Sequence, residues 1–373
     1  MRKGEAHMGP DVSRRDFIAS VAAAGATAGA AAVLGAGRAW AADSLVGVTW
    51  GGAQVEASKA LAEKFSNQVK PTTFSWELHQ GGAANILPKI RATWPQVKYD
   101  IVAAWDPVWH GMIQEDWLEP LGDLTNLKDV PERFWTKDRQ GRPVTAPLNL
   151  AALMWGYRTD LVKKPIASLR DLLDPSLKGL IMLNAPVSYS ALQIVSMALE
   201  FGGSEKSLEP GFDFLKELAR SGNVGRVGGG DIGHINSTTT GEIAVGFGAS
   251  TNWQGIQKSA AVTLLNRVPT SKGFRGFHYT EGWSILRGPK AALAKEFANF
   301  CLGPANDEYY AGAIGAGPTN SKAKPSPELS RYFYKPDELE RFAYFPDFPL
   351  VNSQMQEIVK RFETEIVPLI RKA

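Results

Sequence analysis

Two tryptophans stand at the end of a short apolar run, directly before glycine or aspartate. Trp50 precedes Gly51 and Gly52, and Trp105 precedes Asp106. An indole face attracts ammonium groups and a carboxylate supplies the opposite charge, so this combination can hold a cation. Asp106 also stands before a proline, which is a favoured start for a helix. The sequence therefore leaves two roles open for Asp106, a cation partner or a helix cap.

Paired glycines follow two of the apolar runs. Gly51 and Gly52 form one pair, and Gly81 and Gly82 form the other, each followed by a helix-like pattern. Glycine lets a ligand approach the backbone and the free amides of the following helix start. A tight turn without a ligand is the structural alternative.

The second half of the chain offers polar residues in the same setting. In the segment LNAPVSYSALQ, Ser188 or Ser190 is expected to cap the following helix, and Tyr189 could face a ligand. The segment GFGASTNWQG brings Asn252 and Trp253 to the end of another apolar run. These residues are candidate ligand contacts from a second part of the chain.

Motifs for enzymatic chemistry are weak or missing. The run GGGDIG at 228–233 fits the dinucleotide pattern G-x-G-x-x-G, but HINSTTTGE follows it instead of an apolar helix. The sequence has no phosphate-binding loop, no G-x-S-x-G elbow and no H-E-x-x-H pair, and its histidines are scattered. We therefore expect no catalytic residues, no metal site and no cofactor. A secreted enzyme remains the rival class.

The elements that would position these residues alternate between strands and helices. Expected strands are 44–50, 72–79, 99–105, 180–183 and 242–248, with short strand candidates at 261–269 and 280–288. The first three are each followed by a helical pattern, which predicts a parallel sheet with right-handed crossovers. The long apolar run 144–157 could cross between two lobes.

The first 41 residues look like an export signal. Arg14, Arg15 and Phe17 resemble a twin-arginine signal, a weakly apolar Ala/Gly/Val run follows, and Ala39-Trp40-Ala41 has the pattern of a cleavage site. An uncleaved membrane anchor is the alternative. We expect residues 1–41 to be a signal peptide and the mature chain to be periplasmic.

Composition limits the partners of the mature chain. The net charge of the 373 residues is +3, and residues 1–41 hold five Lys/Arg and three Asp/Glu, so the mature chain is close to neutral. Near-neutrality argues against nucleic acid and against a polybasic membrane surface. A length of this order predicts two lobes. The single Cys301 excludes an intramolecular disulfide.

The order of several segments resembles the bacterial extracellular solute-binding proteins of ABC importers, nearest to the spermidine/putrescine-type binders. The segments are GVTWGGAQVEASKALAEKF, YDIVAAW, MWGYRTDLVKKPIASLRDLLDPSLKGLIML, GEIAVGFG and GPTNSKA. The resemblance implies an α/β, two-lobed periplasmic-binding-protein fold of type II, each lobe a mostly parallel sheet flanked by helices. Lobe 1 would hold 42–148 plus 287–373 and lobe 2 would hold 149–286. Hinge strands would cross near Ala146–Ala152 and Trp283–Leu286.

The resemblance also implies a site and partners. Its pocket segments match Trp50, Trp105, Asp106, Tyr189, Trp253, Glu281 and Trp283, and with the residues above the candidate contacts are Trp50, Gly51, Gly52, Gly81, Gly82, Trp105, Asp106, Ser188, Tyr189, Ser190, Asn252, Trp253, Glu281 and Trp283. Aromatic faces and carboxylates favour a cationic amine such as a polyamine. Helix starts at Gly82 and Ser190, and the lack of an acid in NAPVSYS, favour an anionic solute instead. The expected partners are the solute and a permease, for a protein expected to be a monomer.

Overall fold

The computed structural model describes residues 43–79, 83–325, 327–332, 334 and 338–370, so the predicted signal peptide and the pair Gly81 and Gly82 lie outside it. The strands are β1 (Asp43–Thr49), β2 (Thr72–Leu78), β3 (Ile101–Trp105), β4 (Thr145–Arg158), β5 (Ile181–Asn184), β6 (Val224–Gly228), β7 (Val245–Ala249), β8 (Val262–Leu264), β9 (Gly276–Ile285) and β10 (Ala343–Tyr344).

The α-helices are α2 (Ala53–Gln68), α3 (Ile86–Thr93), α4 (Asp106–Gln114), α5 (Leu192–Glu200), α6 (Glu209–Arg220), α7 (Asp231–Thr240), α8 (Ser250–Gln257), α9 (Ala291–Cys301), α10 (Pro304–Ile314), α11 (Leu339–Phe342), α12 (Phe348–Ser353), α13 (Met355–Arg361) and α14 (Val367–Ile370). Short helical turns are η1 (Ala83–Asn85), η2 (Asn126–Asp129), η3 (Glu132–Phe134), η4 (Leu169–Leu173), η5 (Pro175–Leu177), η6 (Pro186–Tyr189), η7 (Pro327–Arg331) and the π-helical η8 (Phe362–Ile366).

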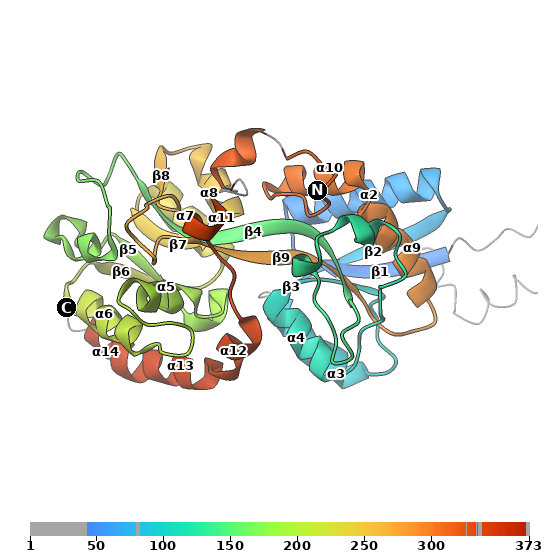
Figure 1. Ribbon diagram of the computed structural model, residues 1–373, viewed down its shortest axis with the longest axis horizontal. Helices are drawn as coiled ribbons and strands as arrows, with labels where there is room; N and C mark the ends of the chain where they lie inside the picture. Colours follow the sequence, from blue (N-terminus) through green and yellow to red (C-terminus); the bar gives the residue numbers. More distant parts are fainter. Residues whose placement is uncertain (1–42, 80–82, 326, 333, 335–337, 371–373) are drawn as a thin grey trace, which may run out of the picture. The chain divides into compact units, whose positions relative to one another are not determined.

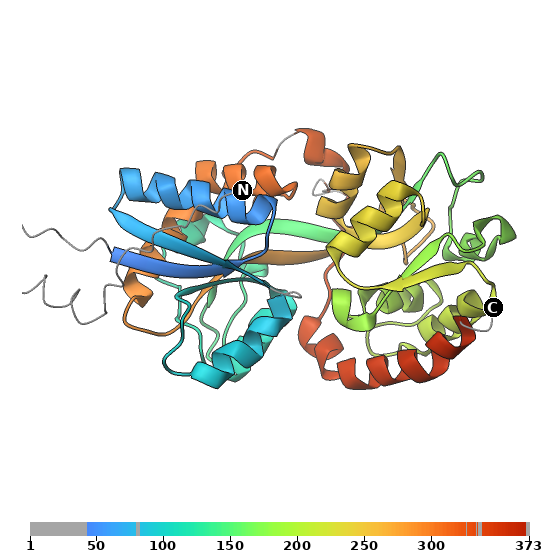
Figure 2. The same cartoon turned by 180° about the vertical axis from the view of Figure 1, so that it is seen from behind.

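The described strands form one sheet with the order β2-β1-β3-β9-β4-β7-β5-β6, to which β10 adds beside β9 and β8 beside β4. β1 runs parallel to β2 and β3, and β5 runs parallel to β6 and β7. β9 and β4 run antiparallel to each other and to their other long neighbours, β3 and β7. The sheet therefore has a parallel part at each side of a central antiparallel pair, and Figures 1 and 2 show that pair passing between the two parts.

We call the two sides lobe 1 (β1–β3 with α2–α4, α9 and α10) and lobe 2 (β5–β7 with α5–α8). Helices cover both faces of the sheet in each lobe. In lobe 1, Phe65 of α2 and Phe297 of α9 are fully buried against one face, and Trp109 of α4 is fully buried against the other. Full burial of such a side chain contributes about 1.5–3 kcal/mol to stability. The predicted α/β class, with mostly parallel sheets flanked by helices, is confirmed.

β4 and β9 belong to both lobes. The β4 residue Leu148 lies in the lobe 1 core, whereas Leu153 lies in the lobe 2 core. The register of the pair shifts between Pro147 and Asn149, opposite Gly282. A Cβ at Gly282 would lie 2.1 Å from the carbonyl oxygen of Ala146, so only glycine fits at this crossing. The core changes along β4 between Leu148 and Leu153, and that these segments act as hinges stays a prediction.

The C-terminal helices depart from the predicted division of the chain. Phe348 of α12, Ile358 of α13 and Phe362 of η8 are buried in the lobe 2 core, whereas the sequence analysis assigns all of 287–373 to lobe 1. Figure 1 shows α13 and α14 on the lobe 2 side near α6, whereas α12 lies between them and α4 of lobe 1. An amphipathic pattern reveals that a helix has a buried face but not which core receives it. Whether the lobes move as separate bodies stays a prediction.

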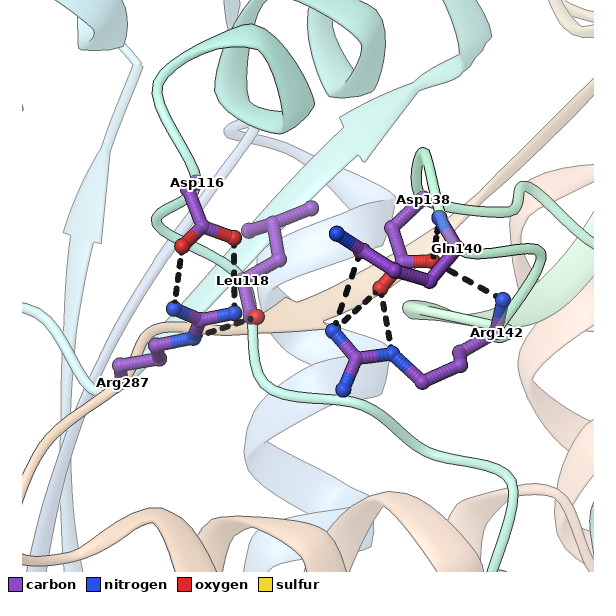
Figure 3. A network of polar contacts seen from close by, with 6 residues as sticks. All are labelled: Asp116, Leu118, Asp138, Gln140, Arg142 and Arg287. Carbon is purple, nitrogen blue, oxygen red and sulfur yellow. Dashed lines mark hydrogen bonds and ion pairs between the residues drawn. The ribbon is translucent and has the colours of Figure 1, made fainter.

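Side-chain hydrogen bonds hold the segment that joins α4 to β4. The guanidinium of Arg287, just after β9, donates to both carboxylate oxygens of Asp116 at 2.6 and 2.8 Å and to the carbonyl of Leu118 at 3.1 Å (Figure 3). Asp138 accepts from the Arg142 Nε at 2.8 Å in the turn before β4. Exposed pairs of this kind add at most about 1 kcal/mol each, so their main effect is to fix the loop geometry.

No helix among the described residues combines the length and the apolar character that a membrane span needs.

Candidate functional site

Glu281 lies at the crossing of β9, between the two lobes. In the ladder it stands opposite Trp105 of β3 on one side and Asn149 of β4 on the other. Burial above all, together with the charges of Asp231 and Asp106, raises the pKa of Glu281 to about 8, although a hydrogen bond from Asn149 lowers it. Glu281 is therefore a partly buried carboxyl group that takes up a proton near neutral pH unless a cation lies beside it.

Asp231 is the second carboxylate of this region and comes from lobe 2. It is the first residue of α7, and its Oδ1 accepts from the Tyr189 hydroxyl at 2.7 Å and from the Asn252 Nδ2 at 2.8 Å. Asn252 also donates to the Tyr189 hydroxyl at 3.0 Å. We call Tyr189, Asp231 and Asn252 the lobe 2 triad. The side chains of Tyr189 and Asn252 are buried, so they hold the carboxylate of the exposed Asp231 in a fixed orientation.

Two aromatic residues lie close to Glu281 in the sheet, Trp105 opposite it and Tyr279 two positions earlier on β9. The ring of Trp105 meets Tyr279 edge-on with 5.2 Å between the ring centroids, and Trp105 remains partly exposed. The pKa of Tyr279 is raised well above its ordinary value by burial and by the charges of Glu281 and Asp231. Tyr279 therefore lies within the field of both acids. We call Glu281, Trp105, Tyr279 and the lobe 2 triad the site cluster.

Asp106 does not have either of the roles that the sequence analysis considers. Its carboxylate accepts from the backbone N–H of Thr280 at 2.8 Å, from the Thr280 hydroxyl at 3.0 Å and from the Thr136 hydroxyl at 3.2 Å. The N-cap residue of α4 is Trp105, and the Asp106 side chain makes no capping bond. Burial raises the pKa of Asp106 to about 6, while these donors lower it. The carboxylate is thus already bound by neighbouring residues.

The end of β1 lies in lobe 1. Trp50 is partly exposed and packs against His79, with 5.2 Å between the ring centroids. Gly51 and Gly52 are exposed, and Gly52, with φ of +69°, is the N-cap of α2 without a capping side chain. A turn that only glycine adopts readily accounts for Gly52, and the amides at the start of α2 remain a predicted ligand contact.

The serines near α5 differ from their predicted role. The N-cap of α5 is Ala191, and no side chain caps this helix, so neither Ser188 nor Ser190 acts as a cap. Ser190 and Ala191 both have positive φ, 47° and 56°, a conformation that costs energy for residues other than glycine. Ser190 is buried and Ser188 is half-buried, which places Ser188 nearer the surface beside Tyr189.

Trp253 and Trp283 belong to the hydrophobic core, in contrast to their predicted role as ligand contacts. Both side chains are fully buried. The Nε1 of Trp253 donates to the carbonyl of Met154 at 3.1 Å, and Trp283 stacks on Phe297 with 4.8 Å between the ring centroids. Trp283 lies on β9 and Trp253 lies in the first turns of α8, and in both elements the ring faces the core.

Two surface cavities lie away from the site cluster. One of 340 Å³ is lined by α9 and the segment before η2, and one of 640 Å³ is lined by α10 and residues from Pro318 to Leu329. Neither includes a residue that the sequence predicts for ligand binding. Within the described ranges, no three His, Cys, Asp or Glu side chains are grouped so that they could hold a metal ion.

Three members of this region are not among the residues predicted from the sequence: Asn149, Asp231 and Tyr279. Neither β6 nor α7 is among the expected elements. The sequence of α7, DIGHINSTTT, is too polar to display an apolar face. The sequence does contain a signal for the start of α7: the run Val224–Gly228 is followed by Gly230 and an acid. In the structure Gly230, with φ of +81°, is the N-cap of this helix.

Comparisons with known proteins agree with this architecture. The model of a family described as bacterial extracellular solute-binding protein matches residues 60–334. A comparison with curated proteins found no match.

Solved structures with the same fold include several transport proteins. The chain is similar to an ABC transporter protein from Clostridium perfringens, with 21% identity, a TM-score of 0.67 and coverage of 86% of this chain and 99% of that one. It is similar to the spermidine/putrescine substrate-binding protein PotD of Streptococcus pneumoniae, with 18% identity, a TM-score of 0.69 and coverage of 87% and 99%. It is also similar to the periplasmic binding protein AfuA of Actinobacillus pleuropneumoniae, solved with fructose-6-phosphate, with 19% identity, a TM-score of 0.68 and coverage of 87% and 98%.

Proposed function

The chain belongs to the bacterial extracellular solute-binding proteins, and from this premise we propose that the solute it captures is a small cationic amine, such as a polyamine. The family is described as extracellular solute-binding protein, and proteins of the same fold are named as ABC-transporter or periplasmic binding proteins; the proposal therefore places the chain in the periplasm as the solute-binding component of an ABC importer. The identity of the solute is the more specific part of the proposal.

The pairing of Glu281 with Asp231 is the observation that supports an amine. After burial, the charge of Asp231 is the next cause that raises the pKa of Glu281. An ammonium group beside the two carboxylates would offset this repulsion and would keep Glu281 ionised. The partly exposed ring of Trp105 offers aromatic surface of the kind that attracts ammonium groups by about 0.5–2 kcal/mol. The site cluster therefore complements positive charge.

An anionic solute fits the same cluster poorly. Anions bind at helix N-termini through free amides and the helix dipole. Here α4 begins with Asp106 and α7 begins with Asp231, so a carboxylate already occupies the first position of both helices. A phosphate or carboxylate ligand at either start would be repelled by the resident charge.

Contacts from both lobes supply a mechanism for capture. The lobe 2 triad comes from η6, α7 and α8, Trp105 comes from β3, and Glu281 lies on the strand that joins the lobes. A solute that touches all of them would bind the closed arrangement more tightly than the open one and so would shift the population toward it. The closed protein would then deliver the solute to the permease. A monomer remains the expected state.

The names of the structural neighbours do not decide the solute, because one refers to spermidine and putrescine and another was solved with fructose-6-phosphate. A thermal-shift screen of the mature protein against putrescine, spermidine, fructose-6-phosphate and citrate makes the distinction. A ligand at 100 times its Kd adds about 2.7 kcal/mol of stability. We expect a rise in Tm with an amine, reduced in Glu281→Gln. Stabilisation by fructose-6-phosphate or citrate alone would refute the proposal.

A further inference from the structure

The ladder between β3 and β9 ends in an unusual way. Trp105 pairs with Glu281, and the chain then turns into α4 at Asp106 instead of continuing beside Thr280. The carboxylate of Asp106 accepts from the Thr280 N–H at 2.8 Å and from the Thr280 hydroxyl at 3.0 Å. A side chain thus takes the place of the backbone carbonyl that the next β3 residue would have offered.

This replacement occurs where β9 leaves lobe 1. Residues of β9 from Glu281 onward pair with β3, whereas Thr280 and the residues before it pair with β4 or β10 and have no partner in β3. A buried backbone N–H must keep a hydrogen-bond partner, and at Thr280 that partner is a carboxylate on a rotatable side chain. A ladder fixes the angle between two strands through a row of bonds, while one carboxylate fixes only a point of attachment.

Thr280 also stands between two residues of the site cluster, Tyr279 and Glu281. The hydrogen bonds that hold β9 at Thr280 therefore also position the side chains of Tyr279 and Glu281. Asp106 is in turn held on the lobe 1 side by the Thr136 hydroxyl at 3.2 Å. The tether runs from the body of lobe 1, through Asp106, to the part of β9 that carries the predicted solute contacts.

We propose that Asp106 is a positioning residue for solute capture: its carboxylate tethers β9 at Thr280 and forms the pivot about which lobe 2 turns relative to lobe 1. This role replaces the ligand contact that the sequence predicts for Asp106. It goes beyond the proposed function, since it applies whatever the charge of the solute.

Distances between the lobes in the solute-free protein test this pivot. Spin labels on Glu63→Cys in α2 and Arg220→Cys in α6 place one probe on an exposed position of each lobe. The native Cys301 is fully buried, so it leaves the labelling specific. Pulsed electron–electron double resonance then gives the distribution of the distance between the two labels. The measurement needs no solute.

The informative variants are Asp106→Asn and Thr280→Val, with Thr280→Ser as the rescue. The matched control is Ser284→Ala, because the Ser284 hydroxyl also joins β9 to β3, through the carbonyl of Val102 at 3.1 Å, but inside the regular ladder. We expect Thr280→Val and Asp106→Asn to broaden or shift the distance distribution, and Thr280→Ser and Ser284→Ala to leave it as in the wild type.

An unchanged distribution in folded Thr280→Val would overturn the pivot, and so would equal broadening in Ser284→Ala. If Asp106→Asn does not fold, Thr280→Val and its serine rescue decide the question. If no amine stabilises the protein but Thr280→Val broadens the distance distribution, the proposed solute is refuted and the proposed pivot is supported.

Discussion

The hydroxyl of Tyr189 donates a 2.7 Å hydrogen bond to Asp231 and so joins η6, after β5, to the first residue of α7, after β6. The bond connects two loops at the carboxyl ends of neighbouring parallel strands. Parallel α/β sheets hold ligands outside the carboxyl ends of their strands. The orientation of Asp231 thus follows from the lobe 2 fold itself.

Removing the charge of Asp231 should weaken amine binding strongly. A hydrogen bond to a charged group is worth about 1.5–3 kcal/mol, so Asp231→Asn is expected to raise the Kd roughly tenfold to a hundredfold. Tyr189→Phe keeps the charge but loses its orientation, and a smaller increase is expected. Calorimetric titration measures both. Val187→Ala, at a neighbouring exposed position, is the control and should bind as the wild type does.

Affinity for an amine should rise with pH. The pKa of Glu281 is raised to about 8 in the solute-free protein, so below pH 8 an amine must displace its proton before the ionised form can bind. The Kd is expected to fall between pH 6 and pH 8, by up to about tenfold per pH unit, and to level off above pH 8. Glu281→Gln should remove most of this dependence. Equal wild-type Kd values at pH 6 and pH 8 would contradict the assignment.

The tryptophans should separate into two classes. Trp283 is fully buried, so Trp283→Phe should lower the Tm and leave the Kd for an amine unchanged. Trp105 is partly exposed beside Tyr279, and Trp105→Ala is expected to lose about 0.5–2 kcal/mol of amine affinity, roughly 2- to 30-fold in Kd. Thermal unfolding and titration of the same samples check both. A loss of affinity in Trp283→Phe without a lower Tm would return this residue to the site.

The crossing of β4 and β9 should tolerate only glycine at position 282. A Cβ there would lie 2.1 Å from the Ala146 carbonyl oxygen, so Gly282→Ala is expected to cost about 1–3 kcal/mol through overpacking. Gly312→Ala is the control, because a Cβ on Gly312 in α10 meets no atom within 4 Å. It should leave stability unchanged or raise it by up to about 1 kcal/mol. Denaturant unfolding compares the two variants.

Much of the fold could be predicted from the sequence because its elements have clear patterns. The long apolar run 144–157, expected to cross between the lobes, corresponds to β4, which is buried almost throughout, and the amphipathic helix expected after Gly52 corresponds to α2. The helix α7 was missed because it buries polar side chains, including His234, Ser237 and Thr238. Local patterns cannot reveal a helix whose buried face is polar.

The site was predicted less well, for a related reason. Strand ends indicated Trp105 and Tyr189 and the family resemblance indicated Glu281, but neither signal tells which side chains turn inward. Trp253 stands next to Asn252, yet Trp253 is in the core and Asn252 belongs to the lobe 2 triad. The direction in which a side chain points is decided by tertiary packing, which a single sequence does not reveal.

Titration of putrescine and spermidine into the mature wild-type protein and into the double variant Asp231→Asn/Glu281→Gln tests the amine site most directly. Saturable binding of one amine per wild-type molecule, lost or weakened at least a hundredfold in the double variant, is the predicted result. Equal amine binding by both proteins, or wild-type binding of fructose-6-phosphate and of neither amine, would contradict it.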